Sequence, residues 1–336
     1  MDSLTHIAIG ACIGEAFFEK GFGKKVIIWG ILAQCIPDID FIAGFWFNTP
    51  DTLFAHRGIT HSILFAVFII PLFALLADKV HRPHNIPFKT WILFFGTEVF
   101  AHLFLDGFNN YGVGWFEPFS HKRFSFNSIY VADPFFSIWA GIAFVMLLIL
   151  NARHTSRKIW WKCGIYIPLI YLSYCILNKF KIDRDVNEIL QKQHIAYTTY
   201  FTTPAPLQNW LWYVVVANHK GYYIGYRSVF DSKKQINFHY VSQNKNLLKT
   251  IKNSDDVKKL IRFSQGFYTI EKNNDTLIFN DLRFGQIVGW QNPDEKFAFH
   301  YYLQYPNDNK LVVQRGRFAK WNWTVTQSFW MRIKGN

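Results

Sequence analysis

Long apolar stretches separated by short polar connections dominate the first half of the chain. Six such stretches follow one another, at residues 4–18, 26–47, 58–77, 88–105, 134–150 and 159–177. About 20 apolar residues are needed to cross the hydrocarbon core of a bilayer. The pattern therefore predicts an α-helical, multi-pass membrane domain of about six spans, which we place at residues 1–178.

Beyond residue 178 the pattern changes to short alternating segments. Residues 179–205 predict a connecting helix, over 181–200, and a linker. His219-Lys220-Gly221 is a hairpin-turn signal, and residues 255–263 form the one clear helix of this half. Runs rich in Trp, Tyr, Val and Ile predict strands at residues 210–217, 222–230, 238–241, 268–271, 276–279, 297–304 and 311–315. We expect residues 206–336 to form a mainly antiparallel α+β domain outside the membrane.

Composition supports a membrane protein with a basic second half. Half of all residues are apolar and 19% are aromatic, with 35 Phe, which is high for a soluble protein. Residues 179–336 carry 23 Lys and Arg against 12 Asp and Glu. A basic domain attached to a membrane predicts contact with anionic lipid headgroups or phosphorylated amphiphilic substrates. Nucleic acid is the second partner considered, but the sequence contains no nucleic-acid-binding motif. The four cysteines have no paired spacing and predict neither disulfides nor a zinc knuckle.

Two pairs of ionisable residues share a helix face inside the apolar stretches. Asp2 with His6, and His102 with Asp106, are each four positions apart, which places both members of a pair on one side of a helix. Glu98 lies one turn before His102 and extends the second pair. Ionisable residues are costly within a membrane, so these positions are candidates for a functional site.

A second set of histidines and aspartates lies between the two pairs. Pro37 should end a helix, so we expect Asp38 and Asp40 to point into a polar cavity. His56 and His61 flank the start of the third apolar stretch. Taken alone, an aspartate after proline is commonly a turn or a helix cap, and the two histidines could be interfacial residues. Their combination with the two helical pairs favours a metal centre.

Histidine and aspartate are ligands of borderline and hard divalent cations. The set exceeds what one ion needs, so we expect two or more ions, zinc or manganese, with a bridging aspartate. Arg57 is expected to bind an anionic group of a substrate, and Glu98 is the deepest candidate catalytic residue. The eight candidate ligands are Asp2, His6, Asp38, Asp40, His56, His61, His102 and Asp106.

These motifs resemble those of the membrane-bound metal-dependent hydrolases, also named LexA-binding, inner-membrane-associated hydrolases. The resemblance covers roughly the first 180 residues. It implies a multi-pass protein of the bacterial inner (cytoplasmic) membrane with a divalent-metal site and a hydrolytic activity. The motifs that carry it are Asp2-x-x-x-His6, Pro37-Asp38-x-Asp40, His56-Arg57-Gly58-x-Thr60-His61-Ser62 and His102-x-x-x-Asp106.

The distribution of positive charge predicts the orientation in the membrane. If all six stretches cross, the candidate ligands and the C-terminal half lie on one side. Connections on the other side carry ten Lys and Arg, whereas the short connections on the motif side carry only Arg57, Lys122 and Arg123. The positive-inside rule then places the metal site and the C-terminal domain outside the cytoplasm.

Three function classes fit this pattern. The first is a hydrolase that acts on a lipid-linked or amphiphilic ester or phosphoester at the outer leaflet. The second is a membrane scaffold or regulator whose metal is structural. The third is a divalent-metal transporter, which is disfavoured because the ligands gather toward one face instead of continuing through the membrane.

Overall fold

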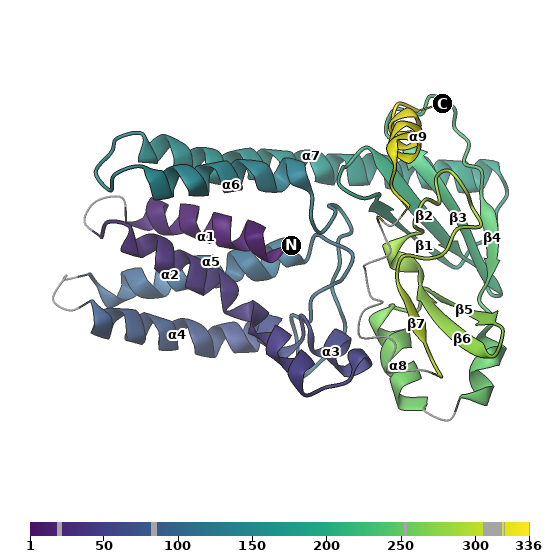
Figure 1. Ribbon diagram of the computed structural model, residues 1–336, viewed down its shortest axis with the longest axis horizontal. Helices are drawn as coiled ribbons and strands as arrows, with labels where there is room; N and C mark the ends of the chain where they lie inside the picture. The colour runs from purple at the N-terminus through teal and green to yellow at the C-terminus, as the bar shows by residue number, and fades with distance from the viewer. Residues whose placement is uncertain (19–21, 82–85, 252–253, 305–317, 319, 336) are drawn as a thin grey trace. The chain divides into compact units, whose positions relative to one another are not determined.

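The computed structural model describes residues 1–18, 22–81, 86–251, 254–304, 318 and 320–335. Its elements divide into two units (Figure 1). The helical unit comprises residues 1–46 and 55–175, and the sheet unit comprises residues 47–54 and 176–336. The boundary falls inside one long helix, α7. Residues 179–205, expected to be a connecting helix and linker, contain the end of α7 and the first strand.

Helices that lie side by side make up the helical unit (Figure 1). The bend expected at Pro37 is present, because α2 ends at Cys35 and a 3-10 helix starts at Pro37. A short helix, α3 (Thr49–Ala55), lies almost wholly in the sheet unit. The elements of the helical unit are α1 (Ser3–Phe17), α2 (Lys25–Cys35), η1 (Pro37–Phe45), η2 (Ile59–His61), α4 (Ile63–Val80), α5 (Phe88–Asp106), α6 (Pro134–Ile149) and the first part of α7 (Arg157–Lys192).

Fewer helices are long enough to span a membrane than the six expected. Within the described ranges, α4, α5 and α7 are sufficiently long and apolar, and the bent pair α2 and η1, with 59° between its halves, makes a fourth. Helices α1 and α6 are apolar but have only 15 and 16 residues. At 1.5 Å per residue such helices are about 24 Å long or less, short of a hydrocarbon core of about 30 Å. The structure therefore supports three to four spans by length.

Glycines bring α1 and α2 into direct backbone contact. A Cβ atom added to Gly10 would lie 2.4 Å from the carbonyl oxygen of Gly30, and one added to Gly30 would lie 2.0 Å from that of Gly10. Such close approach is typical of membrane helices that cross at small residues. Because His6 precedes Gly10 by one turn and Gln34 follows Gly30 by one turn, this crossing places the two side chains opposite each other.

The sheet unit contains the mainly antiparallel structure that the sequence predicts. Strands β1 (Thr199–Pro204), β2 (Leu211–Ala217), β3 (Gly221–Ser228) and β4 (His239–Ser242) form an antiparallel sheet in chain order. Strand β2 is buried along its whole length, because alternate side chains face opposite layers. Trp212, Val214 and Val216 pack with the end of α7, while Tyr213 and Val215 pack with residues such as Leu282.

A second, three-stranded sheet completes the sheet unit, with β5 (Tyr268–Asn273), β6 (Thr276–Asp281) and β7 (His300–Tyr302). Helix α8 (Ser254–Phe263) corresponds to the one helix expected here. The expectation of a single helix was wrong, since α9 (Trp323–Ile333) follows and buries Phe329 and Ile333 against Leu211. Two 3-10 turns, η3 (Lys245–Thr250) and η4 (Leu282–Phe284), connect these elements. The strand expected at residues 311–315 lies outside the described residues.

Candidate metal centre

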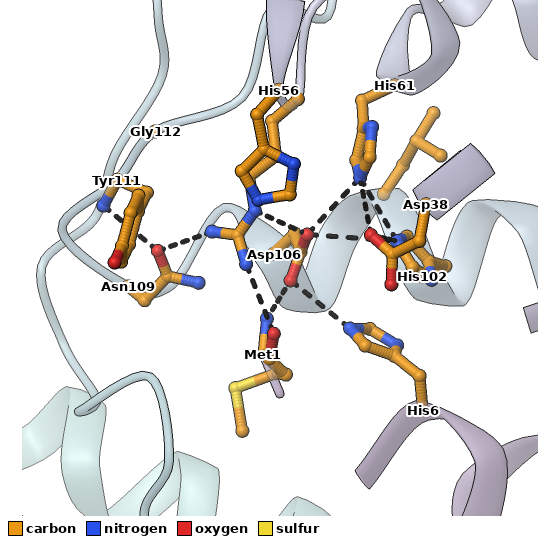
Figure 2. Close-up of polar contacts among 12 residues, drawn as sticks. Met1, His6, Asp38, His56, His61, His102, Asp106, Asn109, Tyr111 and Gly112 are labelled. Carbon is orange, nitrogen blue, oxygen red and sulfur yellow. Dashed lines mark hydrogen bonds and ion pairs between the residues drawn. The ribbon is translucent and has the colours of Figure 1, made fainter. Parts of the chain in front are cut away.

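Four side chains from three segments of the helical unit converge on one point (Figure 2). One comes from η1, one from η2 and two from the last turns of α5. One ligand atom of each lies within 4.8 Å of those of the others. We refer to this set as the four-donor cluster, and its members are Asp38, His61, His102 and Asp106.

The spacing of the donor atoms fits a single small cation. His61 Nε2 lies 3.1 Å from His102 Nε2, 3.5 Å from Asp38 Oδ1 and 3.4 Å from Asp106 Oδ2. His102 Nε2 lies 3.6 Å from Asp38 Oδ1 and 3.7 Å from Asp106 Oδ2. Zinc ligands lie about 2.0–2.1 Å from the ion, so the corners of a regular tetrahedron are about 3.3–3.4 Å apart. The donor set and these five distances are therefore compatible with a divalent-metal site.

Burial makes a cation favourable at this point. Both histidines of the cluster and Asp106 are fully buried. Within the part of the chain that is described, Asp106 Oδ2 accepts no hydrogen bond, but it forms an ion pair with Arg57 Nε at 2.9 Å. Buried charges are paired or coordinate metals, and a cation between the four donors would give this oxygen a second positive partner.

Asp40 supports the cluster from behind. Its Oδ2 lies 3.3 Å from His61 Nδ1 and accepts hydrogen bonds from the Arg57 backbone N–H at 2.8 Å and the Thr60 hydroxyl at 3.1 Å. A carboxylate at the outer nitrogen of a metal-binding histidine fixes the ring and leaves its other nitrogen for the ion. The structure thus places Asp40, an expected ligand, behind His61 and outside the cluster.

His56, also an expected ligand, is held beside the cluster by the same carboxylate. Its Nδ1 lies 3.0 Å from Asp40 Oδ1, its side chain is 38% exposed, and its ring centre is 6.2 Å from that of His61. Partial burial lowers the pKa of His56 below its ordinary value, although the Asp40 carboxylate acts in the opposite direction. A neutral ring that donates from Nδ1 to Asp40 keeps Nε2 unprotonated.

Arg57 differs from the substrate-binding position expected for it. Its side chain is only 3% exposed, and Nε lies 2.9 Å from Asp106 Oδ2. Its two terminal nitrogens donate to Asn109 Oδ1 at 2.7 Å and to the Met1 carbonyl at 3.1 Å, and the guanidinium carbon lies 5.1 Å from the centre of the Tyr111 ring. The side chain is therefore committed to holding Asp106.

The backbone of Arg57 is also unusual, with φ at 59°. A left-handed conformation in a residue other than glycine costs of order 1–3 kcal/mol and persists only where its surroundings enforce it. The carboxylate of Asp40 accepts from its N–H, and its carbonyl accepts from the N–H of Gly114 at 2.9 Å. Both contacts hold the turn between the two histidines of this segment in place.

His6 reaches the cluster from α1 through the other oxygen of Asp106. His6 Nε2 lies 3.2 Å from Asp106 Oδ1, which also contacts the Met1 amino group. His6 Nδ1 lies 3.1 Å from Gln34 Oε1, and the Gln34 amide nitrogen donates to the main-chain carbonyl and to Oε2 of Glu98, at 2.9 and 3.0 Å. Glu98, the expected catalytic residue, is thus fully buried against Gln34, outside the cluster.

Asp2 and the loop between α5 and α6 have supporting positions. Asp2 is the N-cap of α1 and accepts from the Thr5 N–H at 3.0 Å. Arg123 donates to the His56 carbonyl at 2.9 Å. Asp133 caps α6 by accepting from the Phe135 N–H at 2.9 Å. Arg123 therefore stabilises the backbone at His56, beside the cluster, and Asp133 stabilises the start of α6.

Two residues of the site carried no signal in the sequence. Gln34 stands in an apolar run next to Cys35, and Asn109 stands in a loop with several other polar residues. An uncharged amide has no characteristic spacing from metal ligands. Only the helix crossing brings Gln34 to His6, and only the fold of the loop brings Asn109 to Arg57.

Comparisons with known proteins agree with a membrane location. A family model described as YdjM inner membrane protein matches residues 1–182, which include every candidate ligand. "Inner membrane protein YbcI" of Escherichia coli (strain K12) is 31% identical over 123 residues, 36% of this chain and 69% of the relative. "Uncharacterized protein YfhP" of Bacillus subtilis (strain 168) is 27% identical over 248 residues, 67% of this chain and 68% of the relative. No solved structure matches the chain.

The first two names state a membrane location, and none of the three gives a reaction or partner, so they do not confirm the resemblance to metal-dependent hydrolases or to LexA-binding proteins. The family match covers more than half of the 336 residues and coincides with the part of the chain that carries the spanning helices and the four-donor cluster. The chain belongs to the YdjM inner membrane protein family.

Proposed function

We propose that this inner membrane protein is a metal-dependent hydrolase that cleaves an ester or phosphoester bond of a lipid-linked or amphiphilic substrate. The observation that carries the proposal is the convergence of the four-donor cluster inside an apolar helical unit. Two imidazole nitrogens and two carboxylate oxygens suit zinc, and manganese is the second choice. A divalent ion held there, with a further coordination position open to water or substrate, would polarise a substrate oxygen and make the bound water more acidic.

In this proposal a residue of the protein accepts the proton that the attacking water loses. Asp40 holds the His56 ring so that its unprotonated Nε2 is available, and the ring is partly exposed beside His61. This is the arrangement of a general base oriented by a carboxylate. In this proposal His56 accepts the proton of the attacking water, and Arg57 keeps Asp106 in place.

A second cation is part of the proposal. Asp106 offers Oδ2 to the four-donor cluster, and its Oδ1 faces His6 Nε2 at 3.2 Å. A carboxylate that bridges two ions is a common element of hydrolytic two-metal sites. His6 and Asp106 would hold the second ion, in place of the Met1 amino group that contacts Asp106 Oδ1.

The side of the membrane and the substrate class follow from charge and topology. We propose that α1 and α6 also cross, which gives six spans and, by the positive-inside rule, an extracytoplasmic cluster and sheet unit. The excess of Lys and Arg beyond residue 178 favours anionic headgroups or phosphorylated substrates near that unit.

A noncatalytic metal-binding scaffold is the second candidate function. The specific observation in its favour is the guanidinium of Arg57, whose nitrogens contact Asp106, Asn109 and the Met1 carbonyl. In a hydrolase of anionic esters, a guanidinium beside the metal would be expected to face the substrate. Here its nitrogens contact groups of the protein, which is all that a scaffold with a structural metal requires.

Metal analysis of the purified protein, combined with a screen of phosphoester and carboxyester lipids, tests the proposal. We expect stoichiometric divalent metal in the parent and its loss in a His102→Ala, Asp106→Ala double variant. Turnover of one lipid class by the parent, with none in the double variant, would support the hydrolase. Stoichiometric metal with no turnover of any class would favour the scaffold, and full metal occupancy in the double variant would exclude the four-donor cluster.

A further inference from the structure

Gln34 is a buried amide whose orientation is fixed by a group that can only accept hydrogen bonds. Its Nε2 lies 2.9 Å from the main-chain carbonyl oxygen of Glu98. A carbonyl oxygen has no hydrogen to give, so the Gln34 nitrogen must face it. The Gln34 oxygen must then face the other way, where His6 Nδ1 lies at 3.1 Å.

This orientation determines which nitrogen of His6 carries the proton. The amide oxygen of Gln34 is an acceptor only, so His6 Nδ1 must be the donor of their hydrogen bond. In the neutral ring the lone pair is then on Nε2. That lone pair faces Asp106 Oδ1 at 3.2 Å in a fully buried position, where the Met1 amino group contacts the same oxygen and supplies a positive charge. A divalent cation held by His6 and Asp106 would take the place of that amino group.

The structure assigns to Gln34 the role of a positioning residue that holds His6 as an Nε2 ligand of a second divalent cation, shared with Asp106 Oδ1. The inference rests on the proposed metal function and adds the residue that prepares the second position. A partner on the outer nitrogen of a metal-binding histidine fixes its tautomer and orientation, and its loss typically lowers metal affinity 10- to 100-fold.

The crossing of α1 and α2 gives this pair its rigidity. The backbones touch at Gly10 and Gly30, one turn from His6 and Gln34 respectively. Neither side chain is exposed, since both have 0% relative accessibility. His6 therefore has no alternative partner in water, and its tautomer follows the amide.

The experiment measures the tautomer directly by NMR. Full-length protein in detergent micelles, with nitrogen-labelled histidine, is loaded with an NMR-active cadmium isotope as a zinc substitute. We expect His6 to carry its proton on Nδ1 and to show a one-bond cadmium coupling at Nε2. His81, whose Nε2 accepts from the Trp29 indole N–H at 2.6 Å, provides an internal reference for the same tautomer.

Variants then test the role of Gln34. Gln34→Leu should lose the cadmium coupling at His6, and the bound metal should fall from two equivalents to one, while His61 and His102 keep their couplings. Glu98→Gln should keep all three couplings, because the main-chain carbonyl still orients Gln34. Gln208→Leu removes another buried glutamine that donates to main-chain carbonyls, those of Ala205 and Leu211, and should change nothing at His6.

Three results would overturn the inference: a His6 ring protonated on Nε2 or on both nitrogens, absence of cadmium coupling at His6 in the parent, or two retained equivalents in Gln34→Leu. The spectrum of the parent decides the question even if Gln34→Leu does not fold. Absence of cadmium coupling at every histidine would instead refute the proposed metal function, so the two failures are distinguishable.

Discussion

Replacing Arg57 by methionine removes the permanent counterion of Asp106 while keeping most of the side-chain volume. The two side chains are 3% and 0% exposed, with Nε 2.9 Å from Oδ2. Removing one partner of a buried ion pair costs about 3–5 kcal/mol, because the remaining charge is left without compensation. Metal-free Arg57→Met protein should lose about that much free energy of unfolding.

Bound metal should recover part of this loss. A divalent ion in the four-donor cluster again gives Asp106 a positive partner, so the variant should be destabilised less when loaded than when free. We expect the loss of unfolding free energy caused by Arg57→Met to be smaller with metal than without it by at least about 1.4 kcal/mol. By linkage, the folded variant then binds the metal at least tenfold more tightly than the parent does.

The assay is unfolding in mixed detergent micelles with increasing SDS, followed by tryptophan fluorescence, with either excess EDTA or saturating zinc. Arg157→Met is the matched control, because Arg157 forms a buried pair with Glu15, with Nε 2.7 Å from Oε1, and neither belongs to the cluster. The control should lose similar stability under both conditions. A loss below about 1 kcal/mol in metal-free Arg57→Met, or equal recovery by zinc in both variants, would refute the reasoning.

Three further predictions address packing, topology and chemistry. Gly30→Ala should cost about 1–3 kcal/mol and weaken metal binding, because its Cβ would lie 2.0 Å from the Gly10 carbonyl oxygen, whereas Gly96→Ala has open space and should be nearly neutral in thermal melts. In a cysteine-free background, Lys122→Cys and Lys233→Cys should react with an impermeant thiol reagent from one face, and Lys79→Cys from the other; labelling of all three from one face would contradict six spans. His56→Gln should retain full metal but lose about 100-fold or more of any hydrolytic rate, and an unchanged rate would remove His56 from the mechanism.

Spacing along single helices predicted part of the candidate centre. His102 and Asp106 are four positions apart on one helix, and both belong to the four-donor cluster. Asp38 and His61 were expected as ligands because ionisable residues are rare beside apolar stretches. The same rule named Asp40 and His56 as ligands, and it cannot separate a ligand from the residue behind it, because both need the same side-chain chemistry.

The sequence predicted those parts of the fold that depend on a few neighbouring residues. The run of aromatic and β-branched residues over 210–217 and the turn at 219–221 predicted the central hairpin of the sheet unit, since strand propensity and turn residues act over a few positions. The number of spans was not predictable, because 15 or 16 apolar residues suit either a short span or a buried helix. Helix α9 was missed because its aromatic residues also suit a strand.

Arg57 shows that a permanently charged residue next to candidate ligands is compatible with two roles, binding a substrate or holding a ligand in place. From the sequence, a guanidinium between two histidines suggests substrate binding, since nothing in the chain order places an acid near it. In the structure the left-handed backbone of Arg57 directs the side chain toward Asp106, the end of α5, and Asn109 and the Met1 carbonyl take its remaining nitrogens. The Asp106 carboxylate therefore contacts Arg57, His6 and the Met1 amino group, and it also belongs to the four-donor cluster. A cation bound at either oxygen of Asp106 must change the charge that these groups experience, so metal occupancy and the stability of the helical unit should be coupled through this single side chain.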